Sequence, residues 1–192
     1  MSEPAPEFSA SVHDTIISRR TVHAYRPEPV HPEIIQRALV AAHHAPCHKH
    51  TYPWRFSLAG PQARTALAAL AVELKAAKRP LSPEEAKSVQ NKMLNPAVLI
   101  VVGQVRHPDP FRSREDYAAC CCAIQNLSIS LTAEHISSKW STGAITRHPS
   151  THQILGIDPA QQEIIGFIWA GHPERVPTVQ RPPLEAVVRQ TP

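Results

Sequence analysis

The segment HHAPCHKHTYPW, residues 43–54, gathers side chains that are able to do chemistry. Histidines, a cysteine, a lysine, a tyrosine and a tryptophan surround two prolines there. Such a set suits three kinds of site: a metal centre, a cysteine nucleophile, or one wall of a pocket for a flat aromatic ligand. Residues elsewhere in the chain have to separate these alternatives.

A metal centre and a cysteine nucleophile both need further residues that the sequence does not offer. A structural zinc site closes with a second cluster of Cys or His ligands, and no such cluster follows residues 43–50. We therefore expect no metal site. A catalytic Cys47 would need an orienting third group and an oxyanion hole, and no motif indicates either one. We assign no protein nucleophile.

The third alternative follows from the local backbone. Pro46 must end the preceding helix, because proline lacks the amide hydrogen that the helix needs. The side chains of His48, His50 and Tyr52 would then lie on an irregular turn before Pro53. Such a turn can present them to the edge of a planar heterocycle.

Basic residues near the start of the chain could bind an anion. Arg19, Arg20 and Thr21 provide two guanidinium groups and a hydroxyl, which together suit a phosphate. The alternative is a solvated arginine pair that favours the negative end of a helix dipole. The local sequence by itself favours that alternative.

Two further stretches could contact a ligand. In WSTGAIT, residues 140–146, Gly143 permits a positive φ or a close backbone approach, and Ser141 and Thr142 add donors. An ordinary turn after a helix would explain the same residues. Arg181 precedes two prolines that stiffen its backbone, although it could equally be a surface arginine.

Hydrophobic periodicity and turn residues outline the elements that must position these groups. We expect a short helix early in residues 11–25, a helix from Pro32 to Pro46, and a capping-box start at Ser82 and Glu85. The remaining expected elements are helices over 61–80, 82–94, 114–140 and 149–156 and strands over 54–60, 95–105 and 163–173, the last two being apolar enough for burial on both faces. Together they predict an α+β or three-layer α/β chain with more helix than sheet.

Composition narrows the class of protein. The chain has 192 residues and a net charge of +4 without a Lys/Arg block, so we expect one domain that binds small anions rather than nucleic acid. The longest apolar stretch, AVLIVV, is too short for a membrane span, and the N-terminus lacks the pattern of a signal peptide. Cys47 and the run Cys120–Cys122 offer no sound disulfide framework, which predicts a reduced, cytoplasmic protein.

The order of these motifs resembles the nitroreductase superfamily of flavoproteins, and its small "minimal" members above all. The resemblance covers about residues 12–189 and rests on the ordered series SRRTVHAY, APCHKHTYPWRF, AVLIVV, WSTGAIT, IIGFIWAGHP and RPPLEAVV. It implies an α+β fold in which helices flank a central, mostly antiparallel sheet, and an intertwined homodimer with FMN at the interface. We expect a disordered segment at 1–10, an FMN-binding domain at 11–172 and an extension at 173–192 that packs on the partner subunit.

The resemblance also implies the chemistry. FMN would pass hydride from NAD(P)H through its N5 atom to an electron-poor acceptor such as a nitroaromatic, a quinone or an enone, so that no protein residue is catalytic. The implied cofactor contacts are Arg19, Arg20, Thr21, His23, His48, His50, Tyr52, Trp140, Ser141, Thr142, Gly143 and Arg181. Cys47, His50 and Tyr52 depart from the common family turn, where Ser, Asn and Gln stand. The departures at His50 and Tyr52 leave a flavin-binding sensor or carrier with little turnover as an alternative. A histidine-rich metalloprotein that uses residues 43–50 is a separate alternative.

Overall fold

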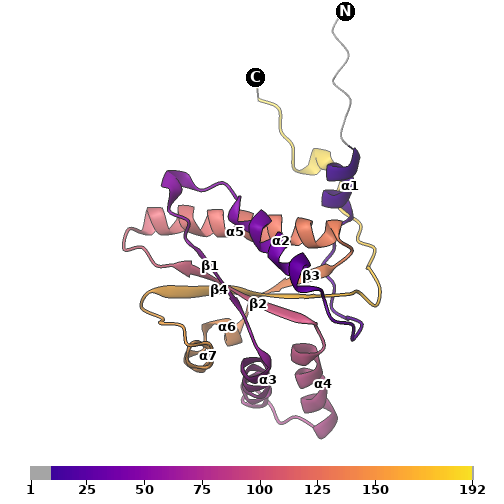
Figure 1. Cartoon of the computed structure of the whole chain (residues 1–192), viewed down its shortest axis with the longest axis vertical. Helices are drawn as coiled ribbons and strands as arrows, with labels where there is room; N and C mark the ends of the chain where they lie inside the picture. The colour runs from indigo at the N-terminus through magenta and orange to yellow at the C-terminus, as the bar shows by residue number, and fades with distance from the viewer. Residues whose placement is uncertain (1–9, 192) are drawn as a thin grey trace, which may run out of the picture.

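The computed structural model describes residues 10–191 and shows a sheet with helices on both faces (Figure 1). The sheet has four strands in the order β1-β2-β4-β3, and every neighbouring pair is antiparallel. The strands are β1 (Trp54–Leu58), β2 (Val98–Val105), β3 (Ser137–Ser141) and β4 (Gln162–Gly171). The expected α+β class and its mostly antiparallel sheet are confirmed.

Two helix layers explain why β2 and β4 are apolar runs. Helices α2 (Pro32–His43) and α5 (Pro110–Ala133) cover one face of the sheet (Figure 1). The other side carries α3 (Pro61–Ala76), α4 (Pro83–Leu94), α6 (Ala144–Arg147) and α7 (Pro149–Leu155). Along β4, Ile168 and Ala170 join the core under α2 and α5, whereas Phe167 and Trp169 join the core on the opposite face.

The helix predicted over 114–140 is partly wrong, since α5 ends at Ala133 and residues Ser137–Ser141 form strand β3. His135 adopts a left-handed φ of 59° and turns the chain, although the segment contains neither Gly nor Pro to signal the break. Trp140 and Ser141, expected in a turn, are the last residues of β3. The strand conformation of this segment results from its pairing with β4 rather than from the local propensity of its residues.

The other helix boundaries follow their caps. Pro32 opens α2, and the predicted capping box of α4 is confirmed by reciprocal bonds between Ser82 and Glu85. Gly156 ends α7 at a left-handed φ of 64°, where glycine avoids the steric cost of a side chain. No helix within residues 10–191 has the length and apolar character that a membrane crossing requires.

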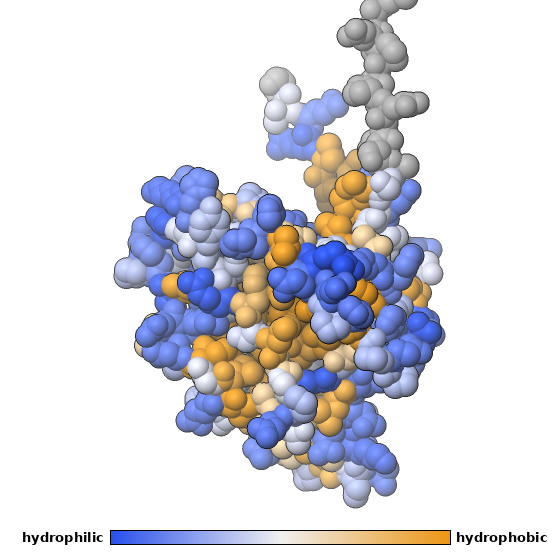
Figure 2. Space-filling view, viewed as in Figure 1, coloured by the Kyte–Doolittle hydropathy of each residue, from blue (hydrophilic) through white to orange (hydrophobic). Residues whose placement is uncertain are grey.

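The ends of the chain form an arm beside the layered body. The first helix, α1 (Ala10–Ser18), and the C-terminal segment with its short helix η2 (Leu184–Ala186) both stand away from the sheet (Figure 1). Apolar side chains remain exposed on this arm, as the space-filling view shows (Figure 2): Val12, Ile16, Ile17, Val176, Val179, Leu184, Val187 and Val188. Of the N-terminal segment expected at 1–10, residues 1–9 lie outside the described part of the chain.

Candidate functional site

Three arginines meet where α1 joins the C-terminal segment. Burial and the nearby positive charges of Arg181 and Arg20 lower the pKa of Arg19. Within residues 10–191, none of the three forms an ion pair with a carboxylate. The lowered pKa of Arg19 indicates that Arg181, although distant in sequence, lies close enough to repel it. A bound anion would relieve that repulsion.

Arg20 and Thr21 hold the backbone of this corner. The Arg20 guanidinium donates to the carbonyl oxygens of Ile17 and Arg19 and so caps the end of α1. Arg20 thus makes the contacts expected of an arginine at the negative end of a helix dipole, as in the alternative to phosphate binding. Thr21 forms a parallel bridge with Ser138 of β3, which fastens the segment to the edge of the sheet.

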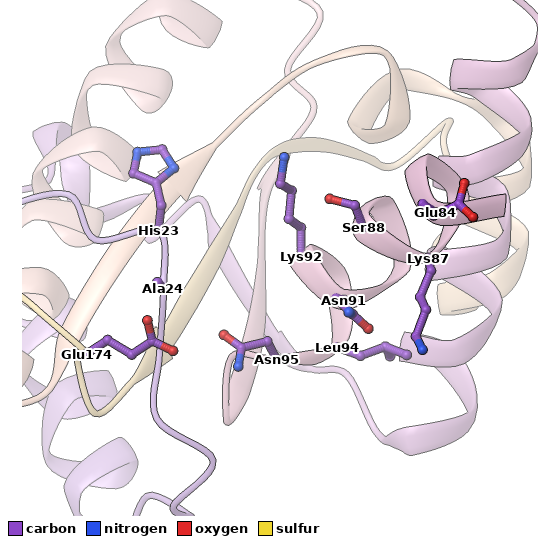
Figure 3. Close-up of a pocket in the computed structure, with 10 residues that line it drawn as sticks. All are labelled: His23, Ala24, Glu84, Lys87, Ser88, Asn91, Lys92, Leu94, Asn95 and Glu174. Atoms are coloured by element: carbon purple, nitrogen blue, oxygen red, sulfur yellow. The ribbon is translucent and has the colours of Figure 1, made fainter. Parts of the chain in front are cut away.

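A cleft of about 680 Å³ continues from this segment to α4 (Figure 3). His23 lies on one side, and Lys92 extends from α4 on the other. Burial, and secondarily the charge of Lys92, lowers the pKa of Lys139 on β3. Sequence inspection missed Lys92 and Lys139, because a lysine on a solvated helix or an edge strand carries no signal of its own.

The side chains of Trp140 and Ser141 are engaged within the chain. The Trp140 indole lies across Gly166 of β4, where a Cβ atom would come within 2.0 Å of its Nε1. Ser141 accepts a hydrogen bond from Trp169 Nε1 at 2.8 Å on the opposite face of the sheet. At the end of β3, Gly143 has a φ of 150°, and open space surrounds its α-carbon. The backbone around Gly143, rather than the two side chains, is free for a ligand.

The turn after α2 holds three non-glycine residues in the left-handed region: Lys49, His50 and Tyr52, with φ of 56°, 53° and 45°. Each such residue costs about 1–2 kcal/mol. Cys47 Sγ offsets part of that cost, since it accepts the Tyr52 amide at 3.2 Å and contacts Thr51 Oγ1 at 3.2 Å. Cys47 is a structural residue here.

A buried carboxylate anchors the same turn to α5. Thr51 Oγ1 donates to Asp116 Oδ1 at 2.7 Å, and Asp116 is only 5% exposed. Arg112 Nε lies 4.0 Å from the other carboxylate oxygen. Neither Thr51 nor Asp116 was flagged from the sequence, because the contact joins residues 65 positions apart.

Aromatic rings line a second hollow, of about 380 Å³, on this turn. The Tyr52 ring packs against His43 and Trp54, with centroids 5.6 and 5.9 Å away. His50 and Tyr52 both line the hollow, whereas His48 does not. Among residues 10–191, no three His, Cys, Asp or Glu side chains are grouped to hold a metal ion.

One chain does not bring all the predicted residues together. The cleft and the hollow share no lining residue. The turn between α2 and β1 lies at the end of the sheet away from α1 and the C-terminal segment (Figure 1). Arg19, Arg181 and His23 thus belong to one surface, and His50 and Tyr52 to another.

Comparisons with known proteins agree on one family. The model of the nitroreductase family matches residues 16–172. The Bacillus subtilis protein YfhC, which carries the name of an NAD(P)H nitroreductase, is 29% identical, with 88% of each chain covered. A nitroreductase-like protein from Bacillus cereus has 25% identity and a TM-score of 0.83, covering 97% of this chain and 99% of its own. A Desulfovibrio desulfuricans structure with FMN has 24% identity and a TM-score of 0.75, with 98% of both chains covered.

Replacing Thr51 by Val should lower the free energy of unfolding by about 1–3 kcal/mol, because Asp116 would lose a buried hydrogen-bond donor. Urea unfolding at fixed protein concentration measures the change. Thr65→Val is the control, since its hydroxyl bonds only the Pro61 carbonyl on an exposed helix face. Equal effects of the two substitutions would contradict the anchoring role.

Proposed function

Because the chain belongs to the nitroreductase family, we propose that it is an FMN-dependent oxidoreductase that passes hydride from NAD(P)H to an electron-poor acceptor. The acceptor would be a nitroaromatic, a quinone or an enone. The name of the B. subtilis relative and the FMN in the D. desulfuricans structure support this proposal. The observation that carries it is the corner where burial and the nearby charges of Arg181 and Arg20 lower the pKa of Arg19, while no carboxylate within residues 10–191 forms an ion pair with these arginines.

The described residues suit FMN. Arg19 and Arg181 provide charge-assisted donors for a phosphate dianion, and Thr21 lies two residues after Arg19 in the chain. His23 and Lys92 line the cleft together with Glu84 and Glu174, and Lys139 lies near Lys92. The positive groups among these residues would stabilise negative charge on a reduced ring. The backbone amides of Thr142 and Gly143, which follow β3, would donate to the flavin ring. When bound, FMN supplies the hydride chemistry, and these residues bind it and orient it.

A homodimer would complete the site. The turn with His48, His50 and Tyr52 lies away from the basic corner of its own chain, so a second copy is required to bring both surfaces onto one cofactor. The arm supplies apolar surface for such an assembly: Leu184 and Val187 are 69% and 78% exposed. All four cysteines are free, which suits a reducing compartment such as the cytoplasm.

One observation favours a second candidate function. Tyr52 places a bulky ring, packed on His43 and Trp54, where the common family turn has glutamine. If that ring covered the flavin, nicotinamide could not stack on it, and the protein would bind FMN as a sensor or carrier with little turnover.

The absorbance spectrum of the purified protein tests the proposal directly. We expect a yellow protein whose flavin absorbance bleaches on anaerobic titration with NADH or NADPH and returns when a quinone is added. Bound flavin that neither nucleotide reduces would favour the sensor or carrier. A colourless protein that takes up no added FMN would exclude both flavin functions.

The double variant Arg19→Gln/Arg181→Gln should bind FMN at least about 100-fold more weakly, because two charge-assisted contacts to the phosphate are lost. Calorimetric titration of the apoprotein with FMN and with riboflavin measures the effect. Riboflavin lacks the phosphate, so its affinity should change much less. Arg189→Gln, an exposed arginine of the same segment, is the matched control. An unchanged ratio of FMN to riboflavin affinity would contradict the clamp.

Deleting residues 176–192 should weaken the dimer, because the apolar side chains of the C-terminal segment would no longer be buried against a partner. Sedimentation velocity over a dilution series measures the dissociation. The full-length variant Leu184→Ser/Val187→Ser should act in the same direction. A truncated chain that stays fully dimeric would refute the docking of the tail.

A further inference from the structure

His50 and Tyr52 form a hydrogen-bonded pair: His50 Nδ1 and the Tyr52 hydroxyl are 3.2 Å apart, and both side chains line the hollow on the turn. We propose that this pair delivers the proton that an acceptor needs when it is reduced. The inference rests on the proposed function and adds a role for two residues of this chain. Tyr52 would touch the acceptor, and His50 would resupply Tyr52.

The hydroxyl is held in place and remains accessible. Tyr52 is 44% exposed, while its ring is fixed by contacts with His43 and Trp54. Trp54 Nε1 donates to His43 Nδ1 at 3.1 Å, so neutral His43 carries its own proton on Nε2. The Tyr52 ring thus rests on a defined surface, and its hydroxyl contacts His50 in the lining of the hollow.

The backbone of this pair is costly and strongly constrained. His50 and Tyr52 both occupy left-handed φ values, which non-glycine residues avoid. Besides the Cys47 contact, the carbonyl of Tyr52 accepts from Arg55 Nη1 at 3.0 Å. Strain of this kind persists where surrounding contacts fix a geometry, and here the result is a fixed orientation of the imidazole toward the phenol.

The proton balance for a nitro acceptor is simple. Two-electron reduction of ArNO₂ to ArNO and water takes up one hydride and one proton. One N–O bond breaks, and the departing oxygen gains two O–H bonds: one from the hydride that the reduced cofactor provides, the other from the Tyr52 hydroxyl. Tyr52 regains a proton from His50 Nδ1, and His50 takes one up from water at Nε2. Exchange of the imidazole protons with water then restores the form protonated on Nδ1 before the next turnover.

Several titratable and charged groups surround the pair. His43 and His44 face it from α2, Cys47, His48 and Lys49 belong to the same turn, and Arg55 lies on β1. No carboxylate lines the hollow, so the groups beside the pair that could also take up a proton are the imidazoles of His43 and His44 and the thiol of Cys47.

Two acceptors separate proton delivery from other effects. The wild type and Tyr52→Phe, each saturated with FMN, are reduced by NAD(P)H and reoxidised either with 1,4-dinitrobenzene or with ferricyanide, which takes one electron and no proton. The ratio of the dinitrobenzene rate to the ferricyanide rate should fall about 100-fold in Tyr52→Phe, in the range expected of a general acid. In His50→Gln, which keeps a polar partner for Tyr52, the ratio should fall less and become dependent on buffer concentration.

A measurement on the apoprotein tests the pair without turnover. In NMR spectra, the imidazole signals of His50 should move in Tyr52→Phe, because Nδ1 loses its contact with the phenol hydroxyl. The imidazole signals of His44 should not move, since its Nδ1 contacts the Val40 carbonyl rather than Tyr52.

Each outcome bears on a different statement. Ferricyanide turnover with an unchanged ratio, or unchanged imidazole signals of His50, would overturn the proton-delivering pair and leave the proposed function intact. Absence of any flavin reduction would overturn the proposed function and this inference together. Wild-type turnover with ferricyanide but not with dinitrobenzene would also overturn the inference.

Discussion

The pairing of β3 with β4 is the contact on which the candidate site depends. It brings Lys139 near Lys92 at the border of the cleft and ends at Ser141, two residues before Gly143. Ser138 of the same strand bridges to Thr21 and so positions the segment from Arg19 to His23. A strand of five residues thereby aligns pieces of chain that are more than one hundred positions apart. Detaching β3 would scatter these groups, even with the two helix layers intact.

Much of the fold could be predicted from the sequence, because β2 and β4 are apolar on both faces and most helices begin at a proline or a capping residue. β3 could not be. Its sequence, SSKWS, has neither alternating hydrophobicity nor a turn residue before it, and its strand state comes from the partner strand. The break at His135 was missed for the same reason, since a non-glycine residue in the left-handed region leaves no mark in the sequence.

The candidate site divides in a similar way. Only the resemblance to a family suggested that Arg19 and Arg181 lie close together, since no local pattern links residues so far apart in the chain. Lys92, Thr51 and Asp116 were missed, because their roles arise from three-dimensional neighbours rather than from motifs. Residues that bind through charge or through a buried hydrogen bond become visible only when the chain is folded.

The contact between Trp140 and Gly166 limits how this sheet can change over time. A methyl group at position 166 would overlap the indole, and without the indole Gly166 and the carbonyl of Ile165 would lose their contact with it. Drift at one position is therefore tied to the other: a larger residue at 166 becomes acceptable only after 140 has shrunk. Positions 140 and 166 should therefore vary together among homologues. A homologue that kept the tryptophan but had a larger residue at position 166 would have to move β3 relative to β4.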